Sequence, residues 1–154
     1  MNIRQSTAED FEALYRLDQE CFAPGIAYSR RTLRAFLRLP NMMCLVADAP
    51  DGVAGFILTD CEGALGHVVT LDVAGVFRRR DLGSTLLADA ESRLAAIGVR
   101  EMEIETATSN EAAIAFWKKH DYLASGILEG YYGKGADAYW MTKKLAGHSG
   151  GKSL

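Results

Sequence analysis

The stretch Leu71-Asp72-Val73-Ala74-Gly75-Val76-Phe77-Arg78-Arg79-Arg80-Asp81-Leu82-Gly83-Ser84-Thr85-Leu86-Leu87 decides the fold. An apolar strand ends in a short basic turn, and the turn leads directly into an amphipathic helix. The first N–H groups of a helix have no partner within the helix, and the helix dipole is positive at that end. The arginines add full positive charges at the same place. The junction therefore predicts a site for a phosphate-like anion, as in a nucleotide-type cofactor.

Length and composition indicate one ordinary globular domain. The chain has 154 residues, of which 49% are apolar and 24% charged, and this length can bury a sizeable core. We expect one domain over residues 1–145 and a flexible tail over 146–154, because the tail is small and polar. The net charge of -3 argues against a dedicated nucleic-acid-binding protein, which needs a strongly basic face.

No apolar run is long enough to span a bilayer, and the start has no signal-peptide pattern, so we expect a cytoplasmic protein without a membrane partner. The three cysteines, Cys21, Cys44 and Cys61, lie in apolar patterns and are expected to be reduced thiols. His, Cys and carboxylate residues lack metal-ligand spacing, so no metal is expected.

Hydrophobic periodicity predicts the order β-α-α-β-β-β-α-β-α-β-β, which implies a mixed α/β (α+β) sheet with helices on both faces. The first strand contains Ile3, and helices start near Thr7 and Ser29. The remaining expected elements are strands 43–48, 53–61 and 66–73 as an antiparallel meander, a helix from Leu82 to Leu94 ended by Gly98, a strand 101–106, a helix 110–119, and strands 122–128 and 138–144. Thr108 and Glu111 have capping-box spacing at the last helix.

Several motifs in order carry a resemblance to a known family. They are the arginine turn, Glu105, Ser109-Asn110-Glu111-Ala112-Ala113-Ile114, and Tyr131-Tyr132 followed by Ala136-Asp137-Ala138. Over roughly residues 2–145 the chain resembles the GNAT N-acetyltransferases, most of all the protein N-terminal acetyltransferases that include the ribosomal-protein alanine acetyltransferases. The resemblance implies the GNAT fold, with a mostly antiparallel seven-stranded sheet whose fourth and fifth strands splay apart.

The resemblance also implies acetyl-CoA as the acetyl donor. The strand end would pair with the pantetheine arm through its main chain, and the N–H groups from Arg79 to Ser84 would wrap the pyrophosphate. Asn110 would contact the cofactor arm. The implied cofactor-binding residues are Leu71, Asp72, Val73, Arg78, Arg79, Arg80, Asp81, Leu82, Gly83, Ser84 and Asn110.

Asp81 departs from the family pattern, which has a glycine at this position of the turn. A glycine lets the backbone approach a phosphate closely, and a carboxylate would repel the anion. The alternative interpretation is that Asp81 caps the helix. Both can hold if the side chain turns away, and we expect weakened but retained cofactor binding.

Two residues are candidate bases for amine attack on a thioester. Glu105 matches the catalytic glutamate of the resembled enzymes, although Glu101, Glu103 and Glu105 also fit a solvated strand face. His67 lies on the fourth strand, near a position where some relatives carry a catalytic tyrosine, and its ordinary pKa of about 6.5 suits a base. A histidine at the start of a strand is otherwise often a surface residue.

The general acid of relatives, a tyrosine, is replaced by Trp117, whose indole N–H cannot release a proton near neutral pH. Trp117 fits a helix core position. Water, Tyr122, Tyr131 or Tyr132 remain alternatives for protonating the thiolate, and Tyr132 is the tyrosine that we assign to catalysis.

Phe22, Tyr28 and Tyr131 resemble the aromatic rim that holds the acceptor, although such loop aromatics also serve packing. The function that follows is direct acetyl transfer to a primary amine, preferably a peptide or protein N-terminus, by a monomer or homodimer. The alternatives are a small-molecule amine acetyltransferase of the same fold and a weakly active CoA-binding sensor module.

Overall fold

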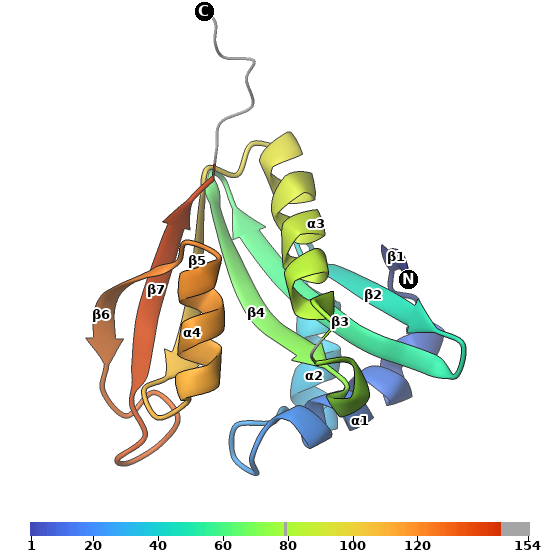
Figure 1. The fold of residues 1–154 in the computed structure, drawn as a ribbon, viewed down its shortest axis with the longest axis horizontal. Helices are drawn as coiled ribbons and strands as arrows, with labels where there is room; N and C mark the ends of the chain where they lie inside the picture. The colour runs from blue at the N-terminus through green and yellow to red at the C-terminus, as the bar shows by residue number, and fades with distance from the viewer. Residues whose placement is uncertain (79, 146–154) are drawn as a thin grey trace, which may run out of the picture.

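A computed structural model describes residues 1–78 and 80–145 (Figure 1). Arg79 and the expected tail over 146–154 lie outside the described residues. The elements follow the predicted order, with two short 3-10 helices added. They are β1 (Asn2–Gln5), η1 (Ala8–Asp10), α1 (Phe11–Cys21), α2 (Arg30–Leu37), β2 (Met43–Ala49), β3 (Gly52–Glu62), β4 (Leu65–Val73), η2 (Gly75–Phe77), α3 (Leu82–Ala96), β5 (Glu101–Ala107), α4 (Glu111–Lys119), β6 (Leu123–Leu128) and β7 (Ala138–Lys144).

The strands form one seven-stranded sheet in the order β1-β2-β3-β4-β5-β7-β6. The β4–β5 pair is parallel, and the other neighbouring pairs are antiparallel. Helices α3 and α4 lie on one face of the sheet, while α1 and α2 cover the other face of β1–β4 (Figure 1). The predicted mixed, mostly antiparallel sheet with helices on both faces is thereby confirmed.

Two apolar clusters hold these layers together. The larger one packs α3 and α4 on the sheet through residues such as Leu86, Leu94 and Trp117. The smaller one packs α1 and α2 on the other face through Leu14 and Leu33, which are fully buried. Such burial contributes about 1.5–3 kcal/mol per large aliphatic side chain, so both helix layers are firmly fixed to the sheet.

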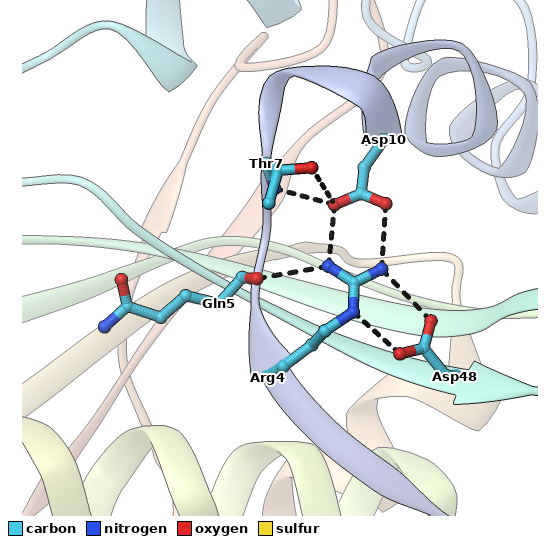
Figure 2. A network of polar contacts seen from close by, with 5 residues as sticks. All are labelled: Arg4, Gln5, Thr7, Asp10 and Asp48. Atoms are coloured by element: carbon cyan, nitrogen blue, oxygen red, sulfur yellow. Dashed lines mark hydrogen bonds and ion pairs between the residues drawn. The ribbon is translucent and has the colours of Figure 1, made fainter.

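A polar network fastens the first strand (Figure 2). The guanidinium of Arg4 donates to both oxygens of Asp10 at 2.9 Å, and to Asp48 at 2.7 and 3.1 Å. Asp10 also accepts from the Thr7 N–H at 2.7 Å, which completes the capping box of η1. One arginine therefore connects β1, η1 and β2.

The predicted capping box at the fourth α-helix is wrong. The N-cap of α4 is Asn110, whose side-chain oxygen accepts from the Ala113 N–H at 3.0 Å. Thr108 lies outside the helix, because its N–H donates to the Asp137 carbonyl at 3.0 Å and ties this turn to the start of β7. The predicted Ser29 cap of α2 is confirmed, with the Thr32 N–H donating to Ser29 Oγ at 3.1 Å.

Candidate active site

The central parallel pair of strands sets the place of the site. β4 and β5 are paired over Leu65–His67 and Glu101–Glu103, and within the described residues the ladder ends there. Beyond this point β4 continues beside β3, and β5 continues beside β7. The two strands have therefore parted where β4 reaches Val73 and β5 reaches Glu105, as the resemblance implied.

His67 and Glu105 meet at this point. His67 Nε2 lies 2.6 Å from Glu105 Oε1. The buried residues of β5, Met102 and Ile104, face α3, which puts Glu105 on the opposite face of the sheet. The Glu105 side chain is 14% exposed and that of His67 is 31% exposed. A carboxylate and an imidazole in this contact form a compact acid–base pair that solvent reaches only in part.

The contact changes the acidity of the imidazole. Burial by itself lowers the pKa of His67, because it penalises the charged ring. The hydrogen bond from His67 to Glu105 and the negative charge of that carboxylate act in the opposite direction, and the net result is a raised pKa. The ring is therefore a stronger proton acceptor than an isolated histidine.

The loop between β6 and β7 brings two tyrosines to Glu105, one to its carboxylate and one to its backbone carbonyl. Tyr131 Oη donates to Glu105 Oε1 at 3.3 Å, and Tyr132 Oη donates to the Glu105 carbonyl at 3.3 Å. Burial is the main cause that raises the pKa of each tyrosine to about 12. The loop is held by Asp137, whose side chain accepts from the Gly130 N–H at 2.8 Å. Both hydroxyls are thus neutral donors around Glu105.

Tyr28 reaches the site from the loop between α1 and α2. Its hydroxyl donates to the Val69 carbonyl at 3.4 Å, and its ring contacts Phe36 edge-on at 5.2 Å between centroids. Val69 is the extra residue of a β-bulge, since Leu58 pairs with Thr70 while Thr59 pairs with Val68. The loops that carry Tyr28 and Tyr131 lie at the same end of the molecule (Figure 1). Phe22 lies at the C-terminal end of α1, next to the same loop.

The anion site was predicted at the start of α3, where the structure leaves backbone N–H groups without an intrahelical partner. Its first N–H groups, those of Leu82, Gly83 and Ser84, precede the first intrahelical bond, which Thr85 donates to the Asp81 carbonyl at 3.0 Å. The Arg80 N–H donates to the Phe77 carbonyl at 3.2 Å, so this group is committed within the turn. Among the described residues, the candidate anion-binding N–H groups are therefore those at the start of α3.

Asp81 occupies the N-cap position in the left-handed region, with φ of 55°. Among the described residues its side chain makes no capping hydrogen bond, so the predicted capping by its carboxylate is wrong. The carboxylate lies 3.6 Å from Lys119 Nζ and is 81% exposed. The left-handed backbone explains why a glycine suits this position, since other residues adopt it at a cost.

The remaining cofactor candidates are engaged with the protein itself. Arg78 Nε donates to the Val73 carbonyl at 3.1 Å, and Ser84 Oγ lies 2.8 Å from His120 Nε2. Burial is the first cause that lowers the pKa of His120. The side chains of Leu71 and Val73 pack on the larger apolar cluster, and the Val73 carbonyl is the acceptor of the Arg78 hydrogen bond.

Two aromatic candidates are placed in the core. Trp117 is 5% exposed and packs edge-on against Tyr122 at 5.3 Å, as expected for a core residue. Tyr122 is fully buried and donates to Glu91 Oε2 at 2.7 Å. The alternative that Tyr122 serves as the general acid is therefore wrong, because its hydroxyl is bound to α3, on the face of the sheet opposite Glu105.

Three features were not predicted from the sequence: the direct contact between His67 and Glu105, the bulge at Val69, and a buried pair of carboxyls formed by Asp18 and Asp72. Each depends on the register between segments far apart in the chain, which local spacing does not specify. The one available signal was an aspartate inside the apolar run Val68–Val73.

The Acetyltransferase (GNAT) family matches residues 11–122 of the chain. The chain belongs to this family. As a GNAT acetyltransferase it is an acyl-transferring enzyme. An N-alpha-acetyltransferase of Saccharolobus solfataricus is 37% identical over 113 residues, which are 65% of this chain and 68% of that relative.

Solved structures share the fold. The ribosomal-protein-S18-alanine N-acetyltransferase from Escherichia coli gives a TM-score of 0.84 at 22% identity and covers 99% of both chains. Arabidopsis thaliana NAA60 in complex with acetyl-CoA gives a TM-score of 0.82 at 19% identity, covering 94% of this chain and 98% of that one.

Within residues 1–78 and 80–145, no helix is long and apolar enough to cross a membrane. In the same residues, no group of three or more His, Cys, Asp or Glu is arranged to hold a metal ion.

Proposed function

We propose that this GNAT acetyltransferase transfers the acetyl group of acetyl-CoA to the N-terminal amine of a peptide or protein, by direct attack within a ternary complex. The observation that carries the proposal is the cluster of His67, Glu105 and Tyr131 where β4 and β5 part. The name of the Saccharolobus relative supports the choice of an N-terminal amine.

The donor fits two parts of the site. The N–H groups of Leu82, Gly83 and Ser84 at the positive end of α3 suit a diphosphate. The main chain of Leu71 and Asp72, on the edge of β4 that β5 has left, suits the amide groups of a pantetheine arm. The Val73 carbonyl would join them if Arg78 Nε released it. Bound acetyl-CoA would supply an activated thioester carbonyl. In the family pattern Asn110 faces the same arm, and its amide can donate while its oxygen caps α4.

Glu105 and His67 remove the proton that the amine must lose. An N-terminal ammonium has a pKa near about 8, so a modest base suffices at neutral pH. The Glu105 carboxylate accepts from His67 and Tyr131 through one oxygen and retains acceptor capacity, since a carboxylate offers about four lone-pair directions. The raised pKa of His67 makes the pair a better proton acceptor.

Tyr132 is the candidate hydrogen-bond donor to the reacting carbonyl or thiolate, and in that role its hydroxyl turns from the Glu105 carbonyl, to which it donates in this structure. A phenol with a pKa of about 12 is a weaker acid than a thiol of about 8.5. The departing thiolate is therefore stable enough to leave without receiving the tyrosine proton, and solvent protonates it. Trp117, which is in the core, takes no part in this step.

Three aromatic residues line the acceptor side of the proposed site: Phe22, Tyr28 and Tyr131. They come from the two loops at the same end of the molecule, and the Tyr28 and Tyr131 hydroxyls are fixed by β4 and β5 respectively. Aromatic walls of this kind suit the first residues of an extended peptide.

The test is a turnover assay with acetyl-CoA and three sets of acceptors: peptides with free N-termini, the same peptides blocked at the N-terminus but containing lysine, and small polyamines or amino sugars. We expect acetylation at the peptide N-terminus, located by mass spectrometry. Glu105→Gln should lower kcat by about 100-fold or more, the usual share of general base catalysis, while acetyl-CoA binding persists.

Glu101→Gln is the matched control, since Glu101 lies on the same face of the same strand, opposite Leu65, and we expect its kcat to match the wild type. Acetylation of small amines alone would replace the proposal by the small-molecule alternative. Acetyl-CoA binding without turnover of any acceptor would support the CoA-binding sensor instead.

A further inference from the structure

A buried pair of carboxyls joins α1 to β4. Asp18 of α1 and Asp72 of β4 are both fully buried, and their side chains lie within hydrogen-bonding reach of one another. Two adjacent carboxylates cannot both stay ionised away from water. One of them must carry a proton, and that proton joins the two side chains.

The partners of the pair fit this arrangement atom by atom. Thr70 Oγ1 donates to Asp72 Oδ1 at 2.5 Å, and the Tyr28 N–H donates to Asp18 Oδ2 at 2.7 Å. The other two oxygens, Asp18 Oδ1 and Asp72 Oδ2, have no partner among the described residues. A shared proton between the carboxyls satisfies them, and burial with the contact to Asp18 holds the pKa of Asp72 well above its usual range.

The pair stands between the two halves of the proposed active site. Asp72 belongs to the stretch of β4 assigned to the donor, and Asp18 holds the backbone of Tyr28 in the acceptor loop, residues 22–29. Gln19 adds a second bond to this loop, since its Nε2 donates to the Tyr28 carbonyl at 2.7 Å. The Tyr28 hydroxyl then reaches Val69 of the same strand.

We propose that Asp18 and Asp72 are positioning residues of the acceptor site, which hold the loop carrying Phe22 and Tyr28 at a fixed place on the donor strand. The role of this loop in acceptor binding rests on the proposed function, whereas the attachment of the loop to β4 rests only on the contacts described above. The pair sets where the acceptor lies relative to Glu105, and neither residue exchanges a proton with the substrate.

The test compares two isosteric single variants with their combination. In Asp72→Asn, the new amide oxygen accepts from Thr70 and its N–H donates to Asp18. In Asp18→Asn, the amide oxygen accepts from the Tyr28 N–H and its N–H donates to Asp72. Each single variant therefore keeps the connection, whereas the double variant places two amide donors face to face and breaks it.

We expect the loop amides of both single variants to exchange at the wild-type rate, because each single variant keeps the connection between the two side chains. The double variant should raise the acceptor KM by about tenfold, the effect of losing one buried hydrogen bond, with the acetyl-CoA Kd unchanged. Amide exchange should accelerate over residues 22–29 in the double variant and not in the core strands β2 and β3. Asp10→Asn is the matched control, a buried aspartate outside the loop, which should lower stability without loosening the loop.

The amide-exchange measurement tests whether the carboxyl pair fixes the loop even if no peptide is acetylated. Failure of this inference can therefore be distinguished from failure of the proposed function. Unchanged loop exchange in the double variant, or equal acceleration throughout the fold, would overturn the inference. So would a faster loop together with an unchanged acceptor KM.

A second measurement tests the inference without the double variant, in case that variant does not fold. Raising the pH should remove the shared proton and accelerate loop exchange in the wild type beyond the intrinsic, base-catalysed rise of amide exchange with pH. Asp72→Asn, which has no such proton, should show only the intrinsic rise. The ionisable groups facing the pair are Cys21 on α1, Tyr28 in the loop, Cys44 on β2 and Arg78 after β4, and they are identical in both proteins. Equal acceleration in both would refute the proposal.

Discussion

The short contact between His67 and Glu105 links the titration of one residue to the charge of the other. In Glu105→Gln the negative charge of the acceptor is lost, although the amide oxygen can still accept from His67, and burial, which lowers the pKa of His67, remains. We therefore expect the pKa of His67, which is raised in the wild type, to be lower in Glu105→Gln. A titration of the imidazole C–H resonances by NMR measures both values.

His120 is the internal reference for this titration, because its ring contacts Ser84 and is separate from Glu105. Its lowered pKa should not change in the variant. A His67 pKa that is the same in both proteins would mean that the contact does not exist in solution. In the wild type, kcat/KM should rise with pH through the raised pKa, because the unprotonated ring is the active form.

Asp81 gives a second prediction for a single residue. Asp81→Gly removes a carboxylate from the positive end of α3 and relieves a left-handed backbone, with φ of 55°. One charge at a helix terminus is worth about 0.3–1 kcal/mol, so acetyl-CoA should bind about two- to fivefold more tightly. Isothermal calorimetry measures the Kd.

Asp81→Asn separates the two causes, because it removes the charge and keeps a side chain that tolerates the left-handed region. If the charge dominates, Asn and Gly should give the same gain. An acetyl-CoA affinity that is unchanged or weaker in Asp81→Gly would contradict the assignment of the anion site.

At the residue scale, the sequence was sufficient to single out Glu105, His67 and Asp81, because each stands at a marked place in a strand or turn. It was insufficient to show that His67 and Glu105 touch. That contact depends on the parallel register of β4 and β5, and a slip of one residue would put Glu105 on the opposite face. Tyr122 was misjudged because the sequence does not show that its hydroxyl has a buried partner in Glu91.

At the scale of elements, the Arg4 network (Figure 2) gives a prediction about stability. Asp10→Ala removes the two 2.9 Å hydrogen bonds from Arg4 and the cap of η1. We expect the free energy of unfolding at pH 7 to fall by about 2 kcal/mol, the usual worth of hydrogen bonds between charged groups. Urea denaturation measures the change.

The effect should depend on pH in a defined direction. The hydrogen bonds from Arg4 hold the pKa of Asp10 below 3.8, against the opposing effect of burial. The stabilisation is therefore complete above this pH and is lost as the pH falls through the lowered pKa. The difference between wild type and Asp10→Ala should shrink below about pH 4, and a constant difference would contradict the assignment. Asp48→Ala, at a more exposed partner of Arg4, should cost less.

Helices and strands were predicted with nearly correct bounds because their apolar periodicity is strong, as along α2 and β5. Their ends were less predictable. At α4 two residues offered capping side chains, and the fold selected Asn110 because Thr108 is bound to the β7 turn. The bulge at Val69 has no local signal, since it arises from the pairing of β4 with β3.

At the scale of the whole molecule, the two halves of the sheet are joined by little main-chain pairing. β4 and β5 share three residue pairs. On the α3 face, Glu91 supplies a side-chain connection, because it accepts from Tyr122 Oη at 2.7 Å and from Lys143 Nζ of β7 at 2.8 Å. These contacts between α3 and the β5–β7–β6 half help to set how far the two strands stand apart at the active site.

Glu91→Ala tests this connection. It leaves the largely buried Lys143 ammonium, 19% exposed, without its partner, and we expect a loss of about 3 kcal/mol in the free energy of unfolding. Tyr122→Phe, which keeps the Glu91–Lys143 pair, should cost about 1 kcal/mol. Thermal and urea unfolding of both variants measure the difference, and equal losses would show that the ion pair is not the main contribution.

Where β4 parts from β5, each strand has an unpaired backbone edge inside the sheet, in addition to the outer edges at β1 and β6. Other chains can add strands to outer edges, and proteins usually protect such edges. The inner edges are protected by the fold itself, since a second folded chain cannot enter between two strands of one sheet. A narrow, extended molecule with amide groups along its length can enter, so the width of the gap selects ligands before any side chain contacts them.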